Sequence, residues 1–314
     1  MGKEKTQPSK ASGPSKEFKT GYCAIVGIPN VGKSTLLNTI LGTKLSIMSA
    51  KPQTTRKRVL GIHSSPTEQI IFLDTPGIMP RPTTLLHKAM LDQVKQSFND
   101  ADVILVLAEA TRQPEQALPE HWDHYVKAAT NKAMVLALSK IDLLKDKEAL
   151  LPLLQKYGEM GVFKDIVPIS SPKSHNIKEL LGVLHQYLPG TQPFYDPEQL
   201  SDQNERFFVS EFIREAVFKK YGEEVPYSTE VEIREFAERE SGKWFINADI
   251  VVERESQKPI IIGKGGVAIK ELGQRARKEI ETFLDHPVFL ELHVKTKSDW
   301  RNDKTALRSY GYDF

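Results

Sequence analysis

The sequence contains a glycine-bounded loop, GIPNVGKS, whose residue types suit the binding of phosphate groups (residues 27–34). It follows the apolar run YCAIV and opens a segment with helical spacing that ends at Gly42. Backbone N–H groups of such a loop converge on phosphate oxygens, while Lys33 adds charge at the β and γ phosphates and the Ser34 hydroxyl ligates Mg²⁺. We expect a nucleoside triphosphate to contact Gly27, Ile28, Pro29, Asn30, Val31, Gly32, Lys33, Ser34 and Thr35.

A second phosphate-site motif is DTPG, which comes directly after the apolar run IIFL. An acidic residue at such a strand end can hold Mg²⁺ through water, and the glycine N–H can sense a γ-phosphate. The motif is weak alone, but its distance from the first loop and its place after a strand strengthen it. We therefore add four residues to the predicted phosphate site, namely Asp74, Thr75, Pro76 and Gly77.

Between these motifs lies KPQTTRKR, residues 51–58, at the position of the first switch of a nucleotide-controlled protein. We expect the Thr55 hydroxyl to reach Mg²⁺ when the γ-phosphate is present, with Thr54 as the alternative. The predicted metal ligands are then Ser34, Thr55 and Asp74.

The motif SKID follows directly after the apolar run MVLAL and favours guanine as the base. The Asp142 carboxylate can accept two hydrogen bonds from the guanine N1–H and exocyclic amine, a donor pair that adenine lacks. Ser139 replaces the asparagine usual in GTPases, and its shorter side chain puts the strength of nucleotide binding in doubt. The loop after the run IVPI can place the Ser171 N–H at guanine O6. The predicted guanine site comprises Ser139, Lys140, Asp142, Ser170, Ser171 and Pro172.

Two residues bear on hydrolysis. Ras-like enzymes orient the attacking water with a glutamine after DxxG, but Ile78 stands there and cannot hold water by hydrogen bonding, so slow turnover is expected. We hypothesise that the Asn30 carbonyl oxygen helps to hold K⁺ against the phosphates; the alternative is that Asn30 only shapes the loop. The predicted catalytic residues are Lys33, Thr55, Gly77 and Asn30.

The elements that must position these residues alternate between apolar runs and helix-like segments, which predicts a mostly parallel sheet with helices on both faces. We expect a disordered tail at 1–18, an α/β GTPase domain at 19–189, and a linker at 190–204, based on the stretch 188–203, which contains three prolines. After it, a helix, two strands, a glycine-rich turn, a long helix and a last strand indicate an α+β domain at 205–314.

The glycine-rich turn of this second half, IIGKGG, has the GxxG arrangement with which a KH domain clamps single-stranded nucleic acid. Residues 258–278 carry six basic residues and one acidic residue, whereas residues 221–240 carry seven acidic and two basic residues. An ordinary solvated helix would explain the charges but not their coincidence with the turn. We expect RNA contacts from Ile262, Gly263, Lys264, Gly265, Gly266, Lys270, Arg275, Lys278, Lys295 and Lys297.

Composition excludes several classes of protein. The chain has 314 residues, 39% of them hydrophobic, and its 43 basic and 41 acidic residues leave a net charge of +2. The longest apolar run has six residues, far below the roughly 20 that a membrane helix needs. The single cysteine, Cys23, cannot form an internal disulfide and fits a reducing cytosol.

The combination of GIPNVGKS, PQTTR, DTPG and SKID with IIGKGG, IKELGQRAR and KTKSDWRND resembles the Era family of ribosome-assembly GTPases over nearly the whole chain. The resemblance implies a P-loop GTPase domain followed by a type II KH domain, with GTP or GDP and Mg²⁺ as ligands. It also implies binding to the 3′ end of small-subunit (16S) rRNA, a role in maturation of the 30S ribosomal subunit, and a cytoplasmic, peripherally membrane-associated location. We expect a monomer that does not bind DNA.

Two other functions compete with a GTP-controlled RNA-binding switch. The chain could be a constitutive RNA-binding module with a largely structural GTPase half, as Ser139 and Ile78 suggest. A GTPase domain that serves an RNA-modifying enzyme ranks last, because the sequence offers neither a cysteine nucleophile nor a metal cluster for such chemistry.

Overall fold

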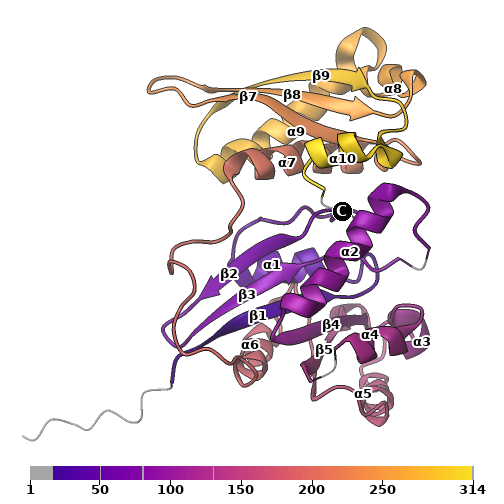
Figure 1. Ribbon diagram of the computed structural model, residues 1–314, viewed down its shortest axis with the longest axis vertical. Helices are drawn as coiled ribbons and strands as arrows, with labels where there is room; N and C mark the ends of the chain where they lie inside the picture. Colours follow the sequence, from indigo (N-terminus) through magenta and orange to yellow (C-terminus); the bar gives the residue numbers. More distant parts are fainter. Residues whose placement is uncertain (1–16, 50, 80, 130, 313–314) are drawn as a thin grey trace, which may run out of the picture.

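The computed structural model describes residues 17–49, 51–79, 81–129 and 131–312, so the predicted tail lies almost wholly outside the described residues. The first half of the chain forms a six-stranded sheet in the order β2-β3-β1-β4-β5-β6 (Figure 1). Its strands are β1 Lys19–Val26, β2 Val59–Ser64, β3 Glu68–Asp74, β4 Val103–Glu109, β5 Ala133–Ser139 and β6 Asp165–Pro168. All neighbouring strands are parallel except the pair β2 and β3.

Helices cover both faces of this sheet, as the apolar strands predict. On one face, Val94 and Phe98 of α2 and Tyr157 of α5 pack on the strands; on the other, Leu37 of α1 and Leu184 of α6 do so. The helices are α1 Lys33–Leu41, α2 Leu85–Asp100, α3 Pro114–Ala117, α4 Trp122–Ala128, α5 Leu150–Glu159 and α6 Ile177–His185, with a 3₁₀ turn at Ile141–Leu143.

Strand β2 is the strand of the first sheet that the sequence analysis missed. Its sequence, VLGIHS, mixes apolar and polar residues with a glycine, so it lacks the apolar run that marked the parallel strands. It pairs antiparallel with β3, and it directly follows the switch segment at residues 51–58. The edge strand therefore anchors one end of that segment to the sheet.

The second half of the chain forms a three-stranded sheet in the order β7-β8-β9, with β7 antiparallel and β9 parallel to β8. Helices α7 and α9 pack on one face through residues such as Phe212, Leu272 and Ile280. The elements are α7 Glu205–Lys220, β7 Glu230–Ala237, β8 Trp244–Val252, α8 Lys258–Ile262, α9 Val267–Leu284, β9 Val288–Thr296 and α10 Lys304–Ser309, with 3₁₀ turns at Glu255–Gln257, Lys264–Gly266 and Trp300–Asn302.

The two halves share buried surfaces. Helices α7 and α10 lie on the side of the second sheet that faces the first half (Figure 1). Leu45, Ile47 and Val59 belong to the same apolar core as α7, so the helix is buried on several sides. A second apolar cluster joins Met90 of α2 to Trp300 near the end of the chain.

The proposed linker at 190–204 contains no helix or strand, as expected, but it is tied to the first sheet along its length. Gly190 bridges Thr20 of β1, and the Gln69 side chain of β3 accepts hydrogen bonds from the backbone N–H groups of Phe194 and Tyr195. In Figure 1 the segment runs along the edge of the sheet before it reaches α7. The linker is therefore held against the first sheet by hydrogen bonds rather than hanging free between the two halves.

None of the helices in the described part of the chain is both long and apolar enough to span a membrane.

Candidate functional site

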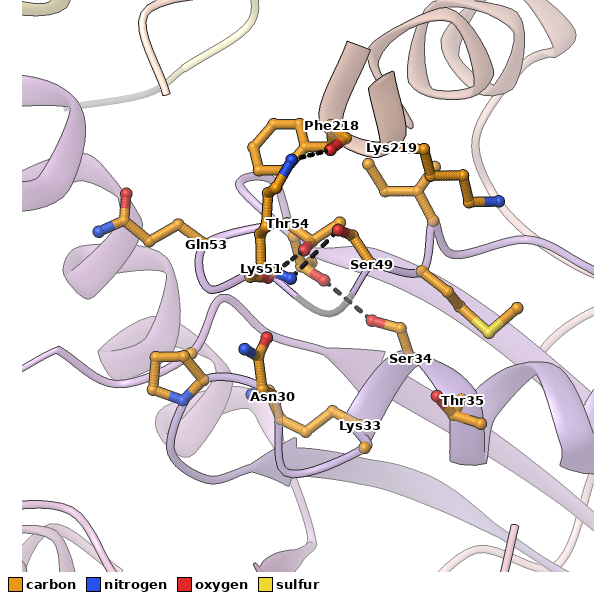
Figure 2. A pocket seen from close by; sticks show the side chains of 16 residues that line it. Asn30, Lys33, Ser34, Thr35, Ser49, Lys51, Gln53, Thr54, Phe218 and Lys219 are labelled. Atoms are coloured by element: carbon orange, nitrogen blue, oxygen red, sulfur yellow. Dashed lines mark hydrogen bonds between the residues drawn. The ribbon is translucent and has the colours of Figure 1, made fainter. Parts of the chain in front are cut away.

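The GIPNVGKS loop joins β1 to α1 and borders a cavity of about 580 Å³ (Figure 2). Gly32 begins the helix in the left-handed conformation, with φ of 109°, which glycine tolerates without steric cost. Of the predicted phosphate contacts, seven line the cavity: Pro29, Asn30, Gly32, Lys33, Ser34, Thr35 and Gly77. The other six belong to the same two motifs but do not line the cavity, namely Gly27, Ile28, Val31, Asp74, Thr75 and Pro76.

Lys33 is only 6% exposed, and its ammonium donates hydrogen bonds of 3.2 Å to the carbonyl oxygens of Gly27 and Ile28. Burial lowers the pKa of Lys33 to about 8, although the Asp74 carboxylate opposes that shift. A buried ammonium held by two backbone carbonyls is prepared to pair with an anion that enters the loop.

The three predicted metal ligands converge. The Ser34 hydroxyl lies 2.9 Å from the Thr55 hydroxyl oxygen and donates a 2.8 Å hydrogen bond to Oδ2 of Asp74. Asp74 is fully buried, and burial raises the pKa of its carboxyl, which Lys33 and Ser34 counteract. Its Oδ1 has no hydrogen-bond partner among the described residues. Three oxygen donors with a spare carboxylate oxygen match the preference of Mg²⁺.

Thr54 does not share this geometry. Its hydroxyl donates a 2.8 Å hydrogen bond to the Lys51 carbonyl and therefore turns back into its own segment. Of the two threonines weighed from the sequence, the structure brings Thr55 to Ser34.

The DTPG loop packs directly on the phosphate-binding loop. A Cβ atom on Gly77 would lie 2.8 Å from Cα of Pro29, so only glycine fits at this close approach. The next residue, Ile78, donates its N–H to the Gly27 carbonyl over 3.1 Å, and its side chain is 3% exposed within the core. An apolar, buried side chain at this position cannot orient water.

Two of the six predicted guanine residues, Asp142 and Ser170, border a second cavity of about 360 Å³. Asp142 lines it, and Oδ1 of Asp142 is buried with no partner among the described residues, as a carboxylate reserved for a ligand would be. Ser170 also lines it, but Ser171 and Pro172 do not. The sequence analysis missed the remaining walls, which are Ile141, Leu144, Lys147, Leu150, Lys173 and His175.

Ser139 and Lys140 stand behind Asp142. The Ser139 hydroxyl is 2.8 Å from the Val31 carbonyl, to which it donates, and 3.1 Å from that of Ala108, which is an alternative acceptor. The side chain, although shorter than the asparagine usual at this position, thus reaches the phosphate-binding loop. Lys140 pairs with Glu109 over 2.9 Å.

Residues from distant parts of the chain also line the phosphate cavity, and sequence reasoning missed them. Met48, Ser49 and Gln53 come from the switch segment or the residues just before it. The motif at residues 51–58 was the sequence signal that could have pointed to them. Phe218 and Lys219 come from the end of α7, and Figure 2 draws them above the switch. The local sequence around Phe218 gives no hint of a nucleotide, because only the packing of the two halves brings α7 there.

The GxxG turn joins α8 to α9 at the end of the second half that lies away from the first sheet (Figure 1). Gly263 has φ of 74°, and a Cβ atom there would lie 2.5 Å from the Ala268 side chain, so this glycine is required by the turn. Ile262, Lys264 and Gly265 are exposed.

A groove of about 300 Å³ runs between α9 and β9. Lys270 lines it, as do Gln274 and Arg277, which the sequence analysis did not select. Arg275 and Lys278 are exposed on α9 but do not line the groove.

Two predicted RNA contacts lie elsewhere. Because side chains alternate along a strand, Lys295 projects from the face of β9 opposite to Leu290 and Leu292, which line the groove. Its ammonium pairs with Asp249 over 2.7 Å. Lys297 follows β9 and lies 3.9 Å from the carboxylate of Asp303. Lys295 therefore faces away from the groove, and Lys297 does not line it.

Comparison with known proteins supports a nucleotide site in the first half and a KH domain in the second half. The family model for 50S ribosome-binding GTPases matches residues 22–140, and the KH-domain model matches residues 224–301. GTPase Era of Nitrosomonas eutropha is 45% identical over 299 residues, which cover 94% of this chain and 98% of that protein. The chloroplastic ERA-like GTPase of Arabidopsis thaliana is 40% identical over 302 residues, covering 95% of this chain and 70% of the relative.

Solved structures agree over the same length. A crystal structure of Era in complex with MgGDPNP and nucleotides 1506–1542 of 16S ribosomal RNA is 42% identical, with a TM-score of 0.89 over 95% of this chain and 100% of that one. A variant of Era from Aquifex aeolicus bound to GDP·AlF₄⁻ is 41% identical, with the same TM-score and the same coverage of both chains. The chain belongs to the Era family of GTPases.

Proposed function

We propose that this GTPase is a nucleotide-controlled RNA-binding switch that binds the 3′ end of 16S rRNA and assists maturation of the 30S subunit. The observation that carries the proposal is the place of the switch segment. Thr55 lies at the phosphate cavity beside Ser34, which in turn donates to Asp74, while its neighbour Arg56 is buried among residues of the KH half. A segment in contact with both the nucleotide site and the KH half can transmit the nucleotide state to the half that carries the RNA site.

We assign the predicted phosphate residues to the triphosphate and Ser34, Thr55 and Asp74 to Mg²⁺. The relative solved with MgGDPNP supports both ligands. The cation supplies charge neutralisation at the β and γ phosphate oxygens. Lys33 adds a second positive charge, and we assign γ-phosphate sensing to the N–H of Gly77, which lines the same cavity.

Slow hydrolysis follows from the buried Ile78 side chain, which leaves the attacking water without a side-chain partner at that position. Asn30 lines the phosphate cavity, which supports the proposal that its carbonyl oxygen helps to hold K⁺ there. Turnover measured in KCl and in NaCl at equal ionic strength tests this role. We expect faster turnover in KCl, and equal rates would refute the role of Asn30.

Guanine selection is assigned to Asp142, supported by its unpartnered buried oxygen. An Asp142→Asn substitution replaces one acceptor oxygen with a donor, so xanthine, which presents an oxygen where guanine has its amine, should bind better. Competition between GTP and xanthosine triphosphate measures the change. An unchanged preference for GTP would contradict the assignment.

The RNA site is assigned to the GxxG turn and the groove beside α9, with Arg277 and Gln274 added to the residues chosen from the sequence. The relative solved with 16S rRNA supports the target. A labelled oligonucleotide with the 3′-terminal 16S sequence should bind with different affinity when the protein holds GDP or a non-hydrolysable GTP analogue. Equal affinities would favour the constitutive RNA-binding module instead.

RNA crosslinking and sequencing in cells would identify the target directly. Binding to the 30S subunit itself, the monomeric state, the absence of a DNA partner, and the cytoplasmic, peripherally membrane-associated location stay predictions.

A further inference from the structure

The KH half holds the residue that precedes Thr55. Arg214 of α7 is fully buried, and its Nη2 donates a 2.6 Å hydrogen bond to the carbonyl oxygen of Thr54. The same guanidinium donates to Glu211 over 2.9 Å from Nε and 2.5 Å from Nη2. This two-point contact fixes the plane of the guanidinium, and therefore the direction in which it meets the Thr54 carbonyl.

The KH half also holds the residue that follows Thr55. The Arg56 side chain is 2% exposed and leaves the switch segment to enter the loop before β7. Its guanidinium donates three hydrogen bonds of 2.7 to 3.0 Å to the carbonyl oxygens of Pro226, Tyr227 and Thr229. Thr55 is thus bracketed by two anchors on the second half of the protein.

A third contact with the KH half lies at the start of the switch segment, at Lys51. The Lys51 ammonium donates to the carbonyl oxygens of Phe218, over 2.5 Å, and Tyr221, where α7 ends. Figure 2 shows the Lys51 side chain extending to Phe218, on the same side of the cavity as Thr54. The Thr54 hydroxyl in turn donates to the Lys51 carbonyl. The backbone around Thr55 is therefore set by α7 rather than by the first sheet alone.

We propose that Arg214, oriented by Glu211, is a positioning residue for GTP hydrolysis, which holds the Thr54 carbonyl so that the Thr55 hydroxyl stays beside Ser34 and Asp74. Arg214 touches neither nucleotide nor Mg²⁺ and acts through the backbone of the switch. The inference rests on the role of Thr55 proposed above and extends it by assigning its placement to the KH half.

The inference predicts that loss of Arg214 affects the binding of GTP and of GDP differently. Thr55 contributes only when the γ-phosphate is present, so loss of its placement should weaken triphosphate binding and leave GDP binding intact. A general loss of folding would weaken both. Because small displacements of a positioned group are costly, turnover at saturating GTP should fall by up to about 10²-fold.

The main test is the double variant Arg214→Met with Glu211→Gln, which removes both buried charges together and so avoids an unpaired ion. Fluorescent GDP and GDPNP with Mg²⁺ report the two affinities. We expect about tenfold weaker GDPNP binding, which corresponds to about 1.4 kcal/mol, with GDP affinity changed less than about twofold. Hydrogen exchange of residues 54–56 in the nucleotide-free protein should also become faster.

Two further variants keep the test decisive. Arg214→Lys preserves the buried charge, but one ammonium cannot reproduce the planar fork, so we expect about threefold weaker GDPNP binding with unchanged GDP binding. This variant gives the answer if the double variant does not fold. Glu279→Gln is the matched control, since it breaks the 2.7 Å ion pair with Lys44 between the same halves without touching the switch segment. It should match the wild type.

Wild-type GDPNP affinity, turnover and exchange in both Arg214 variants would overturn the inference, and so would an equal loss of GDPNP affinity in Glu279→Gln. Parallel losses of GDP and GDPNP affinity would also overturn it, because they indicate a merely structural role. Thr55→Ala separates this failure from failure of the proposed function. If Thr55→Ala weakens GDPNP binding and the Arg214 variants do not, only the positioning role is wrong.

Discussion

The protein has two glycine-rich loops, and their surroundings differ. In the first, Lys33 is buried, and Gly77 packs so closely on Pro29 that a Cβ atom would lie 2.8 Å from its Cα. In the second, Lys264 is exposed, and a Cβ atom on Gly265 would meet nothing within 4 Å in the described structure. The first loop is itself closely packed and holds its ammonium donor in place before a ligand enters. The second leaves its backbone open to a flexible chain and offers charges that salt can screen.

The largest effect should come from Lys33→Met. Loss of a buried ammonium that pairs with phosphate should weaken GDP binding by about 2–5 kcal/mol, measured by titration calorimetry. Lys264→Met on the second loop is the matched control and should leave GDP affinity unchanged. If the two substitutions affected GDP binding equally, the contrast between a buried and an exposed phosphate site would be wrong.

Glycine substitutions should separate the two loops next. Gly77→Ala forces the Pro29 backbone to move, and we expect a loss of about 1–3 kcal/mol in folding stability, seen as a lower Tm, together with weaker GDPNP binding. Gly265→Ala meets no neighbour, but its φ of 61° costs about 1–2 kcal/mol for a residue with a side chain. It should weaken RNA binding and spare nucleotide binding. Reduced nucleotide affinity in Gly265→Ala would contradict the separation of the sites.

Removal of exposed positive charges from the second loop and helix α9 should have a smaller effect, a salt-dependent loss of RNA affinity. Lys264→Gln or Lys270→Gln should weaken RNA binding and reduce the slope of log affinity against log salt concentration by about 1. Lys295→Gln is the control, because Lys295 pairs with Asp249 on the opposite face of the sheet. Fluorescence anisotropy over a range of KCl concentrations measures the slopes. An equal change in the Lys295 variant would mean that RNA also binds that outer face.

The parts of the site that the sequence predicted are those whose geometry is local. A strand, a glycine-bounded loop and a helix are adjacent in the chain, so GIPNVGKS and its helix end at Gly42 could be placed by pattern alone. Thr55 could be chosen because its motif lies between two loops whose spacing was already known. The apolar strands that carry these loops are nearly all buried, which made them visible as runs.

The parts that could not be predicted depend on packing between distant segments. Phe218 reaches the phosphate cavity only because α7 packs beside the switch, and Arg214 meets Thr54 for the same reason. Lys295 is different, since the alternation of β9 already separates it from Leu292 and could have shown that it faces away from the groove. The assignment of Lys295 used charge alone and stays a prediction, whereas strand periodicity would have shown that it lies outside the groove.

The smallest effect should come from Ser139→Ala, which tests how tightly the first loop is braced. The hydroxyl donates to the Val31 carbonyl over 2.8 Å and is also 3.1 Å from the Ala108 carbonyl, although one proton serves only one of them at a time. Its removal should weaken GDP binding by about 0.5–1.5 kcal/mol through a less ordered loop. Ser139→Thr keeps the hydroxyl and is the control. GDP affinity that is unchanged in the alanine variant would mean that the backbone and close packing at Gly77 order the loop without help from Ser139.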